Sequence, residues 1–257
     1  MDEIPGWHAG CSWLAGGTWL FSEPQSAVDT LIDLDRLGWV PLTVTEAGLE
    51  IAATCRVADL HAFAGPEAWR AVPLFRQCID SFLMSFKIWN AATVGGNVCM
   101  SLPAGAMISL TAALEGVCTL WPREGAPRRV PVVDFVTGNH ANVLQPGELL
   151  RSIHLPAAAL SKRTAMRQVS LTKLGRSAAL IIGTVGAYGA DFLLTVTAAT
   201  PRPVQLRFPA CPSAEALRDA LDARLPGDAY FDDVHGSAPY KQHVTRYLAE
   251  QIRSELA

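Results

Sequence analysis

The sequence contains 257 residues, of which half are apolar and 18% are charged, and its formal net charge is -3. This length and apolar content are enough for two ordinary domains, or three small subdomains, with a large core. The acidic net charge argues against a dedicated nucleic-acid-binding protein, because such proteins carry a basic face.

Six cysteines lie far apart in the sequence, and none forms a Cys-x-x-Cys pair. Their spacing therefore gives no evidence of a zinc or iron–sulfur site. No secretory signal precedes them, so we predict reduced thiols in a cytoplasmic protein. The stretch 177–200 is largely apolar, but Gly189-Ala190-Asp191 divides it into two strands joined by a turn, and we predict no membrane span.

The first half of the chain alternates short strands with helices. The most regular helix is predicted over 72–89, where Leu74, Cys78, Phe82 and Phe86 recur every four residues. A strand is predicted at 149–155, where successive side chains lie on opposite sides. We expect this strand to lead from the edge of a sheet into its core. The other elements predicted here are a strand at 12–15, a hairpin of 39–44 and 49–53, a helix at 56–63, a buried helix at 107–114, a strand at 116–121 and an extended segment at 130–136.

Longer strands are predicted in the last third of the chain. One covers 164–172, and two lie on either side of the turn at Gly189. Helices are predicted at 214–225 and 240–256. This change of pattern indicates a second domain that begins after residue 162.

Two Gly-Gly pairs, far apart in the sequence, each follow an apolar run. One is Gly16-Gly17, followed by Thr18, and the other lies inside Thr93-Val94-Gly95-Gly96-Asn97. Each pair alone is more typical of a turn than of a ligand site. Together they predict two loops that present backbone N–H groups to one diphosphate, because residues without Cβ allow a phosphate to approach the backbone closely.

Four segments occur in an order that resembles a known family. From about residue 13 to the C-terminus, the chain is similar to the FAD-binding medium subunits of molybdenum hydroxylases, the family of the xanthine dehydrogenase and carbon monoxide dehydrogenase flavoproteins. The four segments are Leu14-Ala15-Gly16-Gly17-Thr18, Ala92-Thr93-Val94-Gly95-Gly96-Asn97, Pro146-Gly147-Glu148-Leu149-Leu150 and Asp232-Asp233-Val234-His235-Gly236-Ser237-Ala238-Pro239-Tyr240.

The resemblance implies an α+β fold with two domains. A two-lobed α/β FAD-binding domain, of the PCMH type and similar to vanillyl-alcohol oxidase, is expected to precede a smaller α+β domain. The expected limits are 1–53 for the first lobe, 54–158 for the second lobe and 163–257 for the C-terminal domain.

The resemblance also implies which residues contact FAD. Leu150 and Lys173 are expected near the flavin ring, where the cation would stabilise a reduced anionic flavin. On spacing alone, Leu150 and Trp19 are at least as typical of a core, and Lys173 of a solvated strand end. The full set of expected contacts is Ala15, Gly16, Gly17, Thr18, Trp19, Leu20, Thr93, Val94, Gly95, Gly96, Asn97, Leu150 and Lys173.

The implied function is that of an oxidoreductase subunit. Electrons would come from an iron–sulfur small subunit, pass through FAD and leave to an external acceptor such as NAD, oxygen or a quinone. Substrate hydroxylation would take place in a large subunit that holds the molybdenum cofactor. No catalytic pair or metal site is expected in this chain, since a cofactor carries the redox chemistry.

Departures from the family pattern keep other hypotheses open. Trp89 stands where Arg is common, Ala106 stands where Asp is common, and the N-terminal segment is short. The loss of one charge-assisted hydrogen bond at Ala106 predicts an FAD affinity lower by roughly 10- to 150-fold. The alternatives are an assembly or structural subunit on the same fold with a decayed FAD site, and a free-standing flavin oxidase or reductase.

Overall fold

The computed structural model describes residues 6–82 and 84–257. The strands are β1 (Cys11–Leu14), β2 (Thr30–Asp33), β3 (Leu42–Thr45), β4 (Gly48–Ala52), β5 (Val117–Trp121), β6 (Arg128–Pro131), β7 (Val136–Gly138), β8 (Ala141–Asn142), β9 (Leu149–Pro156), β10 (Arg163–Val169), β11 (Ala179–Val185), β12 (Ala190–Thr197) and β13 (Val204–Ala210). The helices are α1 (Val57–His61), α2 (Val72–Asp80), α3 (Phe86–Trp89), α4 (Val94–Met100), α5 (Ala106–Ala113), α6 (Val132–Phe135), α7 (Ala157–Leu160), α8 (Ala214–Arg224) and α9 (Ala238–Leu256).

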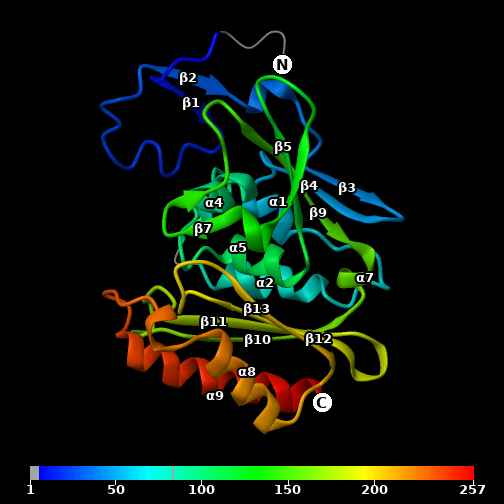
Figure 1. The fold of residues 1–257 in the computed structure, drawn as a ribbon. Coiled ribbons are helices and arrows are strands. Elements are labelled where there is room, and N and C mark those ends of the chain that lie inside the picture. The colour runs from blue at the N-terminus through cyan, green and yellow to red at the C-terminus, as the bar shows by residue number, and fades with distance from the viewer. Residues whose placement is uncertain (1–5, 83) are drawn as a thin grey trace.

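The chain is arranged in three stacked parts (Figure 1). A small lobe with the parallel pair β1–β2 lies at the top, and a sheet of order β3-β4-β9-β5-β6 with short helices lies in the middle. A sheet of order β10-β11-β12-β13 lies below, with α8 and α9 beneath it. This mixture of helices and sheets confirms the predicted α+β fold class.

The strand β9 is central in the middle sheet. It pairs on one side with β4 and on the other with β5, so both edges of its backbone are hydrogen-bonded. The prediction that this strand reaches the edge of the sheet was therefore wrong. The pairing also joins the β3–β4 hairpin to the sheet of the second lobe, although the predicted boundary at residue 53 falls just after that hairpin. The domain limits themselves stay predictions.

The predicted helix over 72–89 is two helices. The helix α2 ends at Asp80, where the Ser81 hydroxyl donates a hydrogen bond of 2.6 Å to the carbonyl of Cys78. The chain resumes as α3 only after Ser85, whose backbone is extended. Serine competes for backbone hydrogen bonds in this way, and the four-residue spacing of Phe82 and Phe86 did not reveal the break. Residue 83 lies outside the described residues.

Both faces of the C-terminal sheet are covered. In β11, Leu180 and Ile182 belong to the core of the middle part, whereas Ala179 and Ile181 belong to the core beneath α8 and α9. All seven residues of β11 are buried, which explains why its sequence is continuously apolar. Within the described residues, no helix combines the length and apolar composition that a membrane-spanning helix needs.

The strand β13 was not predicted, and 130–136 was predicted as one extended segment. Pro209 interrupts β13, and proline lowers the expectation of a strand except at a sheet edge, which is where β13 lies. The segment 130–136 instead contains one helical turn, α6, between β6 and β7.

The helix α5 is enclosed by both halves of the molecule. All eight of its residues are buried, as expected for a helix that is apolar on every side. Its Ser109 hydroxyl lies 2.7 Å from the Thr197 hydroxyl of β12, and the Gln205 amide of β13 donates to the carbonyl of Ala112 at 2.8 Å. The C-terminal sheet is thereby held against the helix that follows the second glycine pair.

Candidate cofactor-binding site

The first glycine pair forms the turn that follows β1. A Cβ atom on Gly16 would overlap the carbonyl oxygen of Ala91, so this glycine lets the small lobe pack against the backbone of the middle part. Gly17 has a φ of 67°, a conformation that glycine adopts without strain. The N–H groups of residues 16–20 make no hydrogen bond with any described residue. Their donors are therefore available to a ligand.

The second glycine pair lies in a helix, not in the predicted loop. Thr93 is the N-cap of α4, and its hydroxyl accepts a hydrogen bond from the N–H of Gly96 at 3.0 Å. The N–H of Val94 donates to Cys55 and that of Gly95 donates to Ala53, at 2.8 and 3.0 Å. The prediction that this segment presents free N–H groups to a diphosphate was wrong, because the backbone of the neighbouring strand region already binds them.

Gly95 is required by packing. A Cβ atom on Gly95 would overlap both the side chain and the backbone of Ala53. Val94 and Gly95 are buried, so of this segment Thr93, Gly96 and Asn97 are the residues that line the cleft. In both pairs, therefore, the first glycine is required where two parts of the chain pack together.

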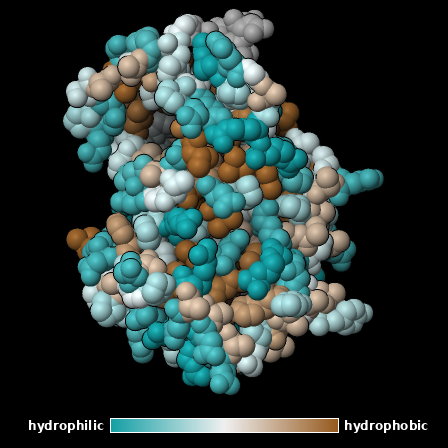
Figure 2. Space-filling view, in the orientation of Figure 1, coloured by the Kyte–Doolittle hydropathy of each residue, from teal (hydrophilic) through white to brown (hydrophobic). Residues whose placement is uncertain are grey.

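A cavity of about 370 Å³ separates the small lobe from α4. Its volume is in the range of small-molecule sites. In Figure 2 the outline of the molecule is indented on the left, below the lobe at the top. The predicted contacts that line it are Ala15, Gly16, Gly17, Thr18, Trp19, Leu20, Thr93, Gly96 and Asn97. The structure thus brings together nine of the thirteen predicted site residues, and none of the described residues in the lining is charged.

Asn97 connects this cavity to a second one. Its side-chain oxygen accepts a hydrogen bond of 3.1 Å from the N–H of Met107, in the first turn of α5. Its amide nitrogen donates to no described residue, and the side chain lines both cavities together with Met84 and Leu102. Asn97 therefore fixes the start of α5 and leaves two N–H donors for a ligand.

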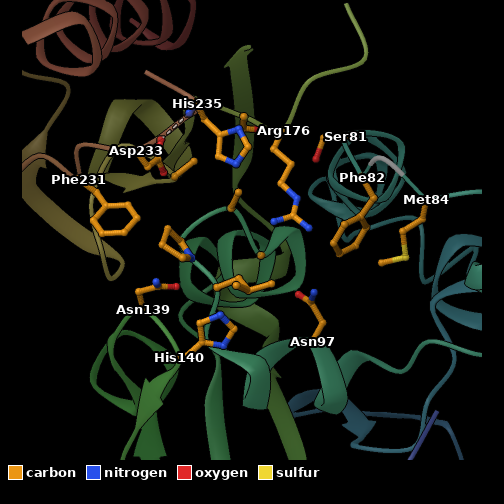
Figure 3. Close-up of a pocket in the computed structure, with 16 residues that line it drawn as sticks. Ser81, Phe82, Met84, Asn97, Asn139, His140, Arg176, Phe231, Asp233 and His235 are labelled. Atoms are coloured by element: carbon orange, nitrogen blue, oxygen red, sulfur yellow. Dashed lines mark hydrogen bonds between the residues drawn. The ribbon is translucent and has the colours of Figure 1, made fainter. Parts of the chain in front are cut away.

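The second cavity, of about 320 Å³, lies between the middle part and the C-terminal sheet. In Figure 3 the Arg176 guanidinium and the Asn97 amide point toward each other across it, with His140 beside Asn97. Among the described residues Arg176 has no ion-pair or hydrogen-bond partner. The sequence reasoning missed Arg176 and His140. For Arg176 a signal existed, since it lies three residues after Lys173.

The negative charge in this cavity is already paired. Asp233 accepts a hydrogen bond of 2.9 Å from the ammonium group of Lys241, which is 0% exposed. The N–H of His235 also donates to Asp233, at 2.8 Å, as Figure 3 shows. A buried lysine needs such a partner, because an isolated buried charge is costly. The unpaired guanidinium of Arg176 therefore makes the cavity favourable for an anionic group.

Two predicted contacts are found elsewhere. Leu150 is buried in the core of the middle sheet, opposite Leu120 of β5. Lys173 is exposed and does not line the second cavity, whereas Arg176 of the same segment does. Both assignments stay predictions.

The site offers dipoles and one cation, but no thiolate or metal-ligand cluster. Burial raises the pKa of Cys99, which lines the first cavity, to about 12, so its thiol is protonated at neutral pH. In the described part of the chain, no group of three or more His, Cys, Asp or Glu side chains is placed to hold a metal ion. An α+β fold with glycines and one unpaired arginine among the described residues of its cavities is suited to binding a nucleotide cofactor.

A family model described as the FAD binding domain in molybdopterin dehydrogenase matches residues 5–158. The chain belongs to this family, as its sequence predicted, and FAD is its cofactor. The described residues fit that cofactor, because the first turn, whose N–H groups have no acceptor among the described residues, and Asn97 line adjoining cavities.

Curated relatives include two dehydrogenases. The chain is 28% identical over 123 residues to a xanthine dehydrogenase of Oryza sativa subsp. japonica and 29% identical over 147 residues to the carbon monoxide dehydrogenase medium chain of Afipia carboxidovorans. The alignments cover 45% and 56% of this chain, and 9% and 50% of the two relatives. The chain therefore matches half the length, or less, of these relatives.

Solved structures share the whole fold. Quinoline 2-oxidoreductase from Pseudomonas putida 86 superposes with a TM-score of 0.80 at 16% identity, over 96% of this chain and 90% of that one. A Cu,Mo-carbon monoxide dehydrogenase in its cyanide-inactivated form gives 0.79 at 21% identity, over 96% and 91%. At these identities the likeness shows that the C-terminal sheet, beyond the matched FAD domain, belongs to the same fold.

Proposed function

We propose that this chain is the FAD-binding electron-transfer subunit of a molybdenum hydroxylase. The observation that carries the proposal is the pair of adjoining cavities, one lined by the first glycine turn and the other by Arg176, with Asn97 in the walls of both. In this role the chain takes electrons from an iron–sulfur partner subunit and passes them through FAD to an external acceptor. FAD supplies chemistry that no side chain here supplies, since it can accept electrons one at a time and release them as a pair.

The chain's own residues bind and orient the cofactor in this proposal. The N–H groups of Gly17 and Thr18, with the Thr18 hydroxyl, hold the diphosphate, and the Asn97 amide donates to the segment that follows. Arg176 lies in the second cavity, where the flavin ring is placed by this route, and there its positive charge favours a reduced anionic ring. Because none of the described residues that line the first cavity is charged, its binding of FAD depends on oriented dipoles.

The partners follow from the relatives. The name of the Afipia carboxidovorans relative, a medium chain, implies that it works with other chains. For this chain we propose an iron–sulfur small subunit and a large subunit with the molybdenum cofactor, with NAD, oxygen or a quinone as the external acceptor. The described cysteines are all free, which supports a reducing, cytoplasmic location.

The first experiment is the visible absorption spectrum of the purified chain and of the supernatant released from it by heat. We expect flavin absorption, with FAD and not FMN released. The chain is then freed of any flavin and titrated separately with FAD and with adenosine, which gives its affinity for each. An affinity for FAD no higher than that for adenosine contradicts the proposal. A chain that stays colourless after FAD is added favours the assembly-subunit alternative. Co-purification with iron–sulfur and molybdenum-containing chains distinguishes a subunit from a free-standing flavin enzyme.

A further inference from the structure

Two aromatic rings meet where the two cavities join. Trp19 lines the first cavity and His140 lines the second, and their ring centroids are 5.6 Å apart at an interplanar angle of 44°. The cavities share Met84, Asn97 and Leu102 in their walls. Trp19 belongs to the small lobe and His140 to the turn between β7 and β8. Their contact therefore bridges the cleft from one lobe to the other.

Both rings are attached to well-defined backbone. The carbonyl of Trp19 accepts hydrogen bonds from the N–H and the hydroxyl of Ser22, at 2.9 and 2.8 Å. The N–H of His140 donates to the carbonyl of Ser101 at 3.0 Å, and His140 has a φ of 54°, which is uncommon for a residue other than glycine. Asn142, two residues later, donates to Cys99 and Ser101 at the end of α4.

The contact between the rings is weak enough to open. Trp19 is 37% exposed and His140 is exposed, so the pair lies at the surface of the cleft and is not part of a core. An aromatic pair of this kind contributes a modest amount beyond the area that it buries. Such a contact allows a ligand to enter, but it must break each time a ligand that lies beneath it leaves.

We propose that Trp19 and His140 form a strap across the FAD cleft that slows release of the cofactor. This inference rests on the proposed function, because it requires FAD to extend from the first cavity into the second. The strap requires both rings, because it is their contact with each other that slows the release of FAD. Trp19 stacking on the cofactor by itself would not need His140.

The test measures how fast FAD leaves the full-length chain. The chain is loaded with FAD and diluted, and the recovery of flavin fluorescence gives the dissociation rate for the wild type, Trp19→Ala, His140→Ala and the double variant. We expect each single variant to release FAD roughly three- to tenfold faster, and the double variant to be no faster than either single variant. Trp19→Phe, which keeps a ring, should remain close to the wild type and guards against a folding defect in Trp19→Ala. Tyr247→Ala, an exposed aromatic residue of α9, is the matched control and should leave the rate unchanged.

The outcomes separate this inference from the proposed function. If the wild-type chain binds no FAD, both are wrong. If it binds FAD but either single variant releases it at a rate within twofold of the wild type, the strap is wrong and the proposed function stands. Rate increases that multiply in the double variant also contradict the strap, because they show that the two rings act independently.

Discussion

At the scale of single residues, Asn97 combines a structural and a ligand-binding group in one side chain. Its oxygen accepts the N–H of Met107 and so caps α5, whereas its amide nitrogen, on a side chain that lines both cavities, has no partner among the described residues. Substitution can separate the two groups. Aspartate keeps the accepting oxygen and removes the donor, whereas alanine removes both.

We therefore predict different effects for the two substitutions. Asn97→Asp should unfold at nearly the same urea concentration as the wild type but bind FAD at least about tenfold more weakly, since a carboxylate replaces a donor beside an anionic ligand. Asn97→Ala should also lose stability, by about 1 kcal/mol, because α5 loses its cap. Urea unfolding and FAD titration of the same samples measure both quantities. Equal affinity of the Asp variant and the wild type would show that the amide does not contact FAD.

From the sequence, both glycine pairs could be recognised as places where another group approaches the backbone closely, but the approaching group could not be identified. Glycine permits close approach of any backbone, whether the approaching group is a phosphate or another strand. Gly16 and Gly95 face Ala91 and Ala53, contacts that join residues far apart in the sequence. His140 could not be predicted as part of the site for the same reason, because only the fold brings it to Trp19.

At the scale of elements, a cluster of four charged side chains joins α5, β10, β12 and β13. Lys162, just before β10, is 7% exposed and donates to Glu115 at 2.7 Å and to Asp191 at 2.5 Å. Arg207 of β13 pairs with the same two carboxylates. Hydrogen bonding by Lys162 is the main cause that lowers the pKa of Asp191 below its ordinary value of 3.8, with Arg207 adding to it against the opposing effect of burial.

The cluster predicts how stability depends on pH. A carboxylate whose pKa is lower in the folded chain contributes stability above its ordinary pKa of 3.8, and the contribution is lost as the pH falls through the folded value. Lys162→Gln should reduce the free energy of unfolding at pH 7 by about 1.5–3 kcal/mol and should lessen the fall in stability below pH 4. Arg70→Gln, at an exposed residue with no ion pair among the described residues, is the control. Urea unfolding between pH 3 and pH 7 measures this, and parallel curves for the two variants would exclude a role for the cluster.

Predictability from the sequence differed between elements. The helices α8 and α9 and the strands β11 and β12 lie close to their predicted positions, because their apolar patterns are long and a single turn separates the strands. The segment containing α4 was predicted as a loop, because glycine is unfavourable in helices, yet the Thr93 cap and the contact with Ala53 hold the helix in place. The break after α2 coincides with the hydrogen bond of the Ser81 hydroxyl to Cys78, and a serine there does not change the apolar pattern.

At the scale of the whole molecule, the two cores share a sheet. One face of β11 completes the core of the middle part, and α5 is buried between that part and the C-terminal sheet. The change of pattern after residue 162 is visible in the sequence, but the shared core is not, because each half of the pattern is apolar enough to form a core alone. Sharing of this kind favours unfolding of the two halves in one transition.

Aromatic residues provide separate signals for the two halves. All seven tryptophans lie between residues 7 and 121, and all four tyrosines lie between residues 188 and 247. We predict that tryptophan fluorescence and tyrosine absorbance change at the same urea concentration, because loss of the C-terminal sheet would expose α5 and part of the first core. An earlier tyrosine transition would show that the C-terminal sheet unfolds independently.

FAD should then shift both signals by the same amount. A ligand at one hundred times its dissociation constant adds about 2.7 kcal/mol to the free energy of unfolding, if it binds only the folded chain. In the proposed site, FAD contacts the small lobe at Gly17 and approaches Arg176 of the C-terminal part, so its binding energy is lost when either half unfolds. A shift of the tryptophan signal alone would show that the two halves unfold separately and that FAD stabilises only the half that holds the first cavity. Equal shifts follow from a single transition wherever FAD lies in the cleft, so they support the shared core, whereas the FAD affinity of an Arg176→Ala variant tests whether the cofactor reaches the second cavity.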